Sequence, residues 1–193
     1  MDKRSGMPSC ERDDDRGLWE SWRRVAVQPT FYDAITSLYR LVDEEIGERG
    51  PRCDASGRCC QFNTYGHLLY VTGVEIVWVL GQLDQSSEET CKEHSGKHEG
   101  LSLTVLQTAE RSVDDAGRGM DGCVYQTAEG LCGAHAVRPL GCRVYYCDPE
   151  HQDWQNDLYE KYLDALKKLH QQYDMPYRYM EWRAGLAEAS KYL

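Results

Sequence analysis

The chain has 193 residues and a mass of 22.2 kDa, which is enough for one domain with an ordinary hydrophobic core and too little for two. Its formal net charge of -10, from 22 Lys and Arg against 32 Asp and Glu, argues against nucleic acid as a partner, because phosphates would meet no broad cationic surface. The N-terminal residues lack the apolar stretch of a secretory signal or a membrane span. We therefore expect a cytoplasmic protein with no membrane role.

The first 17 residues are polar and include an acidic run, so we expect residues 1–17 to form a disordered leader and residues 18–193 to form a single domain. Apolar residues at helical spacing predict a helix from Thr30 to Gly47. Residues 68–71 are expected to form a short strand. Thr72 and Glu75 have the spacing of a capping box, which predicts that a helix starts there and runs to Leu83.

A long polar loop is expected over residues 84–100, followed by an irregular helix over 101–116. Asp148 and Pro149 resemble the start of another helix, which carries the longest apolar stripe in the chain: Trp154, Leu158, Tyr162, Leu166, Leu169 and Tyr173. Pro176 ends that helix, and a last helix is expected over residues 179–192. The sequence thus predicts a mostly α, small single-domain helical protein with two irregular Cys-rich loops converging on a metal site.

Nine cysteines are more than packing alone requires, and their number is odd. In a reducing compartment, clustered cysteines are metal ligands or catalytic groups more often than disulfides. Their position in Gly-rich segments without helical periodicity argues against a role as buried apolar side chains. We therefore interpret them as metal ligands.

The first cluster contains Cys53, Cys59 and Cys60, with Gly57 between them to let the backbone fold back. Neighbouring side chains in an extended segment point to opposite sides. Cys59 and Cys60 are therefore expected to serve different metal atoms, unless a tight turn brings them together.

The second cluster contains Cys123, Cys132, His135, Cys142 and Cys147, and the spacing from Cys132 to His135 suits chelation of one ion. Together the clusters offer seven cysteines and one histidine. These eight donors could fill two tetrahedral sites, two four-ligand clusters, or one cluster with the remaining donors left structural.

Arg138 and Arg143 flank Cys142. They could donate hydrogen bonds to the metal-bound sulfurs and offset the negative charge of a thiolate site. The alternative is a turn fixed by Pro139, with both arginines on the surface. Cys91, His94 and His98 could also chelate together, but polar residues are expected in such a loop. Cys10, in the leader, is expected to have no part in the site.

The two clusters together resemble the YkgJ-type cysteine cluster family of zinc- or iron-chelating proteins, named for a C-x-x-C-x-x-C-C motif. That motif corresponds to Cys53, Ser56, Cys59 and Cys60, and the block from Cys132 to Arg143 is similar to the family's downstream half. The resemblance implies metal or iron-sulfur binding. Ser56 stands where the family has a cysteine, and a serine hydroxyl is a poor ligand at neutral pH, so His135 is the first replacement to consider.

We expect an iron-sulfur cluster, or iron ions, serving a redox or accessory role with a redox or assembly protein as partner, because the donors are mostly thiolates. A structural zinc or metal-handling module is the alternative. A weaker alternative is a lysine N-methylase related to the flagellin methylases, which share the motif. An enzyme would need an open coordination position and a pocket beside the metal; the sequence names no substrate or reaction.

Overall fold

A computed structural model describes residues 9–92 and 122–193 of the chain. The described part is mostly helical, as the sequence predicted. Its elements, in chain order, are α1 (Ser9–Ala26), α2 (Pro29–Arg49), η1 (Arg58–Cys60), α3 (Phe62–Tyr65), β1 (Tyr70–Thr72), α4 (Gly73–Lys92), η2 (His135–Val137), α6 (Leu140–Val144), η3 (Pro149–His151), α7 (Gln152–Gln172), β2 (Tyr179–Glu181) and α8 (Trp182–Tyr192).

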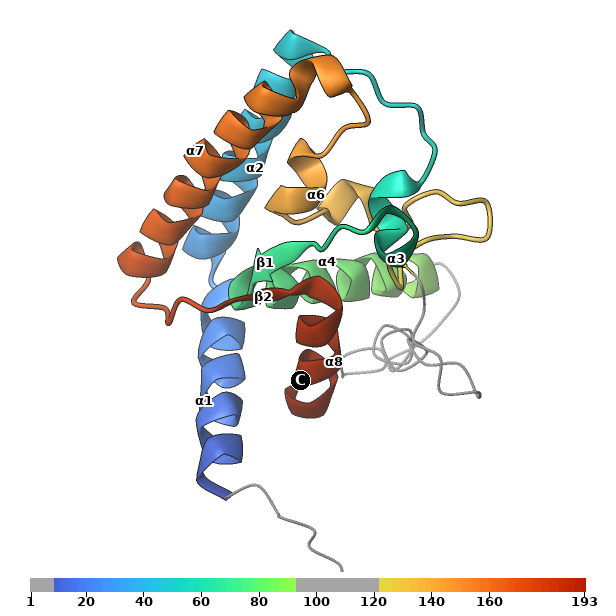
Figure 1. Cartoon of the computed structure of the whole chain (residues 1–193). Helices are drawn as coiled ribbons and strands as arrows, with labels where there is room; N and C mark the ends of the chain where they lie inside the picture. The colour runs from blue at the N-terminus through green and yellow to red at the C-terminus, as the bar shows by residue number, and fades with distance from the viewer. Residues whose placement is uncertain (1–8, 93–121) are drawn as a thin grey trace, which may run out of the picture.

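The helices form two packed groups, one of α2, α6 and α7 and the other of α1, α4 and α8 (Figure 1). In the first group, Phe31 on α2 meets Tyr173 at the end of α7 edge to face, with ring centroids 5.2 Å apart. The predicted stripe of α7 is confirmed, because Leu158, Tyr162 and Leu166 are all buried. The long amphipathic faces thus supply much of the core.

The two strands lie where the helix groups meet and pair antiparallel, with Val71 opposite Met180. The expected strand therefore exists and covers Tyr70–Thr72. Its partner lies in residues for which the sequence predicted only helix: Tyr179–Glu181 form β2, and the last helix begins at Trp182. Three residues of strand are too few for their alternation to be visible in the sequence.

The predicted capping residue Glu75 joins the two helix groups from a position buried to 1% exposure. Its Oε2 accepts from the Thr72 backbone N–H at 2.8 Å and from the Thr72 hydroxyl at 3.1 Å. Its Oε1 accepts from the Tyr39 hydroxyl and from the Leu140 backbone N–H, both at 2.9 Å. One carboxylate therefore links β1 and α4 to α2 and α6.

The expectation of a disordered leader over residues 1–17 is wrong for residues 9–17, which belong to α1. The helix is held by Trp19 and Trp22, both fully buried. The Trp22 ring lies against Gly73, where a Cβ would approach it to 2.1 Å, and its Nε1 donates to the Pro176 carbonyl at 2.9 Å. Residues 1–8 lie outside the described part of the chain.

Two predicted boundaries were also wrong. Helix α2 continues past Gly47 and ends at Gly50, whose φ of 63° closes the helix with a bond from its N–H to the Ile46 carbonyl. Helix α4 continues through residues 84–92, which were expected to be a loop. The expected helix over 101–116, together with His94 and His98, lies outside the described residues, as does the side chain of Cys91.

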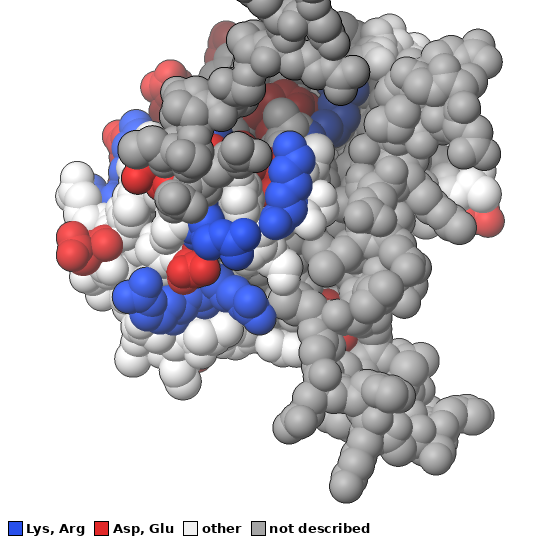
Figure 2. Space-filling view, turned by 90° about the horizontal axis from the view of Figure 1, so that it is seen from below, with Lys and Arg blue, Asp and Glu red and all other residues white. Residues whose placement is uncertain are grey.

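Acidic and basic side chains are mixed on the described part of the face seen from below in Figure 2. Arg178 forms ion pairs with two acidic residues: it donates to Asp15 at 3.0 Å and to Glu188 at 2.8 Å. No helix in the described segments has the length and apolar composition needed to cross a bilayer.

Candidate metal centre

The first cysteine segment ends in a tight turn. Gly57 has a φ of 68°, and the 3-10 turn η1 that follows it carries both Cys59 and Cys60. With three residues per turn, neighbouring side chains of such a helix diverge less than those of an extended strand. The tight-turn exception therefore applies, and Cys59 and Cys60 belong to the same group of thiols.

Glycines allow the second cysteine segment to pack directly on this turn. The Cys123 backbone N–H donates to the Cys60 carbonyl at 2.7 Å. At Gly122 a Cβ would lie 2.4 Å from that carbonyl oxygen, and at Gly57 it would lie 2.1 Å from the Gly130 carbonyl oxygen. The Gln126 amide completes the contact by donating to the Gly130 carbonyl at 3.1 Å and the Gly57 carbonyl at 3.3 Å.

The thiol of Cys60 is the centre of the group, because the thiols of Cys123, Cys132 and Cys59 all shift its pKa. These contacts raise the pKa of Cys60 far above its usual value. The same contacts act in the opposite direction on its neighbours: hydrogen bonding from Cys60 lowers the pKa of Cys59 to about 6 and that of Cys132 to about 7. The pKa of Cys123 is lowered by Cys60 in the same way.

Cys142, on α6, adds a fifth thiol near this group. Burial raises its pKa well above the usual value, and the charges of Cys123 and Cys132 raise it further. Arg138 opposes this effect and also lowers the pKa of Cys59 and Cys132 by its positive charge. Its side chain is fixed by donation from Nε to the His135 carbonyl at 3.1 Å and from Nη1 to the Cys142 carbonyl at 3.3 Å. Arg138 therefore fits the predicted role of offsetting thiolate charge.

Trp182, the first residue of α8, is a further member of the site that the sequence did not predict. Its ring is buried to 2% exposure, and no acceptor in the described part of the chain meets full hydrogen-bond geometry for its indole N–H. That N–H lies close enough to the Cys123 sulfur to lower the pKa of this thiol, after the larger effect of Cys60. A buried donor without a full partner is therefore directed to a sulfur of the group. The two residues lie 59 positions apart, so no local pattern connects them.

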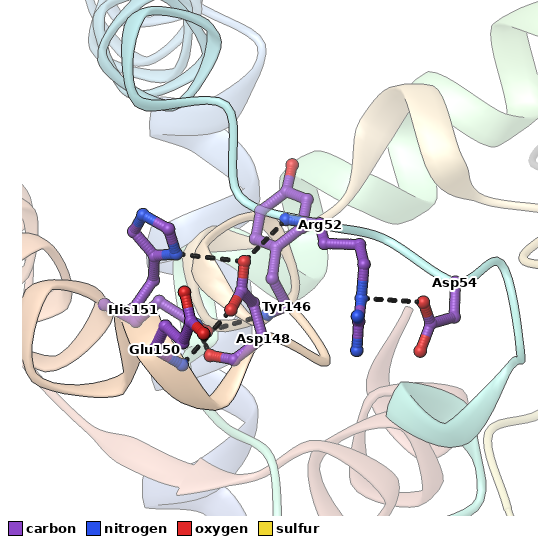
Figure 3. Close-up of polar contacts among 7 residues, drawn as sticks. Arg52, Asp54, Tyr146, Asp148, Glu150 and His151 are labelled. Atoms are coloured by element: carbon purple, nitrogen blue, oxygen red, sulfur yellow. Dashed lines mark hydrogen bonds and ion pairs between the residues drawn. The ribbon is translucent and has the colours of Figure 1, made fainter.

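Cys53 precedes η1 and Cys147 follows α6, so both lie in the loops at the ends of the two cysteine segments. Cys53 is exposed, and Cys147 is half-buried with its sulfur 3.8 Å from the Ser56 hydroxyl. Figure 3 shows how the two loops meet: the Asp148 carboxylate accepts from the Arg52 backbone N–H at 2.9 Å and lies 2.9 Å from His151 Nδ1. The two predicted ligands therefore lie beside a polar contact between loops.

His135 and Arg143 are placed differently from their predicted roles. His135 is exposed, and the charges that act on its imidazole are those of Arg138, Arg143 and Asp43. Arg143 is buried, and its guanidinium donates to Asp43 at 2.7 Å and to the Arg138 and Ala136 carbonyls at 2.7 and 3.1 Å. It therefore ties the second cysteine segment to α2, and its donors point to oxygen atoms.

Within residues 9–92 and 122–193, no three or more Cys, His, Asp or Glu side chains are already arranged to hold a metal ion. The donor chemistry nonetheless fits a thiophilic metal: five sulfurs gather from two segments, with one arginine and one orphaned indole N–H directed at them.

A pocket of about 300 Å³ borders the thiol group, and Cys59 and Cys142 form part of its wall. The opposite wall comes from α7, β1 and β2. The thiol group is thus next to a space large enough for a small molecule.

No protein-family model matches this chain, and no curated protein or solved structure shows significant similarity to it. The resemblance to the YkgJ-type proteins therefore stays a prediction from the two cysteine motifs.

Proposed function

We propose that this protein binds a metal through Cys59, Cys60, Cys123 and Cys132, with Cys142 as a fifth thiol at the edge of the centre. The observation that carries the proposal is that three other thiols, from both predicted clusters, act together on the pKa of the Cys60 thiol. The thiolate-rich motifs of the YkgJ-type proteins support the same function.

The thiol group needs more positive charge than its own protons supply. The single S–H of Cys60 can donate to one sulfur at a time, whereas three sulfurs surround it. A divalent cation at the middle of the group would contact all four sulfurs at once and replace their protons. Arg138 would offset the negative charge that four thiolates leave around such an ion.

The mutual influence of the four thiols on their pKa values favours a single tetrahedral ion, zinc or iron. Thiolates bound to zinc lie about 2.3 Å from the metal, so two of them are roughly 3.8 Å apart. In a four-iron cluster each cysteine binds a different iron, and the sulfurs must lie further apart. We therefore put a mononuclear four-thiolate site first and an iron-sulfur cluster second, the latter supported by the thiolate-only donor set and by the family resemblance.

Metal and acid-labile sulfide content, measured with the visible spectrum on protein purified without oxygen, tests this proposal. We expect about one equivalent of zinc or iron per chain and no sulfide. Equal amounts of iron and sulfide with a brown colour would replace the single ion by a cluster and keep the thiolate centre. A folded protein that contains no metal, and takes up none when zinc or ferrous iron is added, would overturn the proposal.

A further inference from the structure

The pocket beside the thiol group is the feature from which we draw a further inference. We propose that it binds an uncharged, planar organic molecule, held against aromatic side chains next to Cys59 and Cys142. This site goes beyond metal binding and does not require it, because the pocket is formed by side chains of α3, β1, α6, α7 and β2.

The shape of the pocket favours a flat ligand. Two pairs of rings line it in nearly parallel orientation: Tyr70 with Tyr179, at 5.4 Å and 22°, and His67 with Tyr145, at 5.5 Å and 13°. Parallel rings present flat faces on which another ring can stack. A volume of about 300 Å³ is at the small end of ligand pockets, which limits the occupant to one compact ring system.

The charge of the pocket favours a neutral ligand. None of the 15 described residues that line it is Asp, Glu, Lys or Arg. An anionic molecule would therefore lose hydration without gaining a counter-ion. The long-range field of the acidic chain would further oppose an anion, since the formal net charge is -10.

Neutral polar groups at one edge can still orient the ligand. Gln152 and Asn156 are exposed and lie four residues apart on α7, so their amides lie on the same face of the helix. The buried amide of Gln155 is not available, because it accepts from the Tyr146 backbone N–H at 2.8 Å and donates to the Asp148 carbonyl at 3.3 Å. A ring with carbonyl or ring-nitrogen groups fits these donors and acceptors.

The entrance is apolar for an exposed surface. Leu68 is 55% exposed, and Tyr70, Tyr145 and Tyr179 are between 38% and 40% exposed. All four line the pocket. Exposed apolar side chains gathered around one opening are typical of a binding site, whereas isolated ones need no explanation.

A fluorescence titration with lumiflavin tests the proposal on the full-length protein. This probe is uncharged, planar and rich in carbonyl and ring-nitrogen groups, and stacking on tyrosine quenches its emission. We expect saturable quenching with one site per chain. Metal content is measured on the same sample, so that failure of the metal proposal and failure of this one are read separately.

Two variants and a matched control locate the site. Tyr70→Ala and Tyr145→Ala each remove one stacking ring and should weaken binding about tenfold. Tyr32→Ala is the control: it removes a tyrosine of similar exposure, 38%, that does not line the pocket. Circular dichroism checks that all three variants are folded.

A charged analogue of lumiflavin tests the claim that the pocket prefers an uncharged ligand. Flavin mononucleotide carries the same ring system with a phosphate, and it should bind at least tenfold more weakly than lumiflavin. The proposal is overturned if lumiflavin shows no saturable binding, if Tyr32→Ala weakens binding as much as the pocket variants do, or if the phosphate-bearing flavin binds as tightly.

Discussion

The hydroxyl of Ser56 lies 3.8 Å from the sulfur of Cys147. Two residues singled out by the sequence, one from each cysteine segment, are therefore neighbours. Ser56 occupies the second position of the C-x-x-C-x-x-C-C motif. A cysteine at position 56, as that motif has it, would therefore stand beside Cys147.

Replacing Ser56 by alanine should leave the metal content of the protein unchanged. The hydroxyl is a poor metal ligand, and its nearest cysteine is Cys147. Elemental analysis of the purified variant, side by side with the wild type, checks this. Loss of metal in Ser56→Ala would show that the loop around Cys147 belongs to the centre.

Replacing Trp182 by phenylalanine should weaken metal binding about tenfold. The variant keeps a buried ring and removes the N–H that lies near the Cys123 sulfur, and hydrogen bonds to a metal-bound ligand typically change affinity by this amount or more. Competition with a chromogenic chelator measures the affinity.

Trp78→Phe is the matched control for this change. Trp78 is also buried, and its indole N–H also has no hydrogen-bond partner among the described residues, but its ring packs against Tyr39 at a centroid distance of 5.1 Å. An equal loss of affinity in the two variants would remove the assigned role of Trp182.

Replacing Glu75 by glutamine should destabilise the fold by about 2–3 kcal/mol. Each carboxylate oxygen accepts two hydrogen bonds, so an amide NH₂ would face two donors whichever way it turned. Burial raises the pKa of Glu75, and the donors from Thr72, Leu140 and Tyr39 oppose this rise. Urea unfolding measures the loss. Glu44→Gln, on an exposed part of α2, should change stability little, and an equal effect there would contradict the role assigned to Glu75.

His170 should make the protein less stable in acid. It is 2% exposed, its Nδ1 lies 3.2 Å from the Pro176 carbonyl, and desolvation lowers its pKa. A histidine with a lowered folded-state pKa takes up its proton more readily when unfolded. Its contribution is thus fully present above the unfolded pKa of about 6.5 and is lost as pH falls through the folded value.

The comparison of wild type with His170→Gln between about pH 7.5 and pH 5 isolates this effect. The free energy of unfolding should fall more steeply with decreasing pH in the wild type, because only the wild type takes up a proton at position 170 when it unfolds. The thiols contribute equally to both proteins, so their effect cancels in the comparison. Parallel pH profiles would contradict the prediction.

The long amphipathic helices were predictable because their burial follows a local period. In α7, Leu158, Tyr162 and Leu166 recur every four residues, and this spacing alone identifies the buried face. Helix α1 was not predictable in the same way. Its first half is highly charged, and it is held by contacts of Trp19 with Glu188 and of Trp22 with Pro176, both more than 150 positions away.

The candidate site was predictable at the level of its cysteine segments. Which sulfurs meet depends on the turn at Gly57 and on the close packing of Gly122 against Cys60, neither of which residue spacing reveals. The sequence therefore grouped Cys53 and Cys147 with the other cysteines, and it assigned Cys59 and Cys60 to different metal atoms unless a tight turn brought them together.

The most direct test of the account compares the metal content of Cys60→Ala with that of Cys53→Ala, both purified without oxygen and checked for folding by circular dichroism. Cys60 is the thiol whose pKa the other three thiols shift, whereas Cys53 is exposed in the loop before η1. We predict that Cys60→Ala loses the bound metal and that Cys53→Ala keeps it. Retention of the full metal content by a folded Cys60→Ala protein would contradict the account.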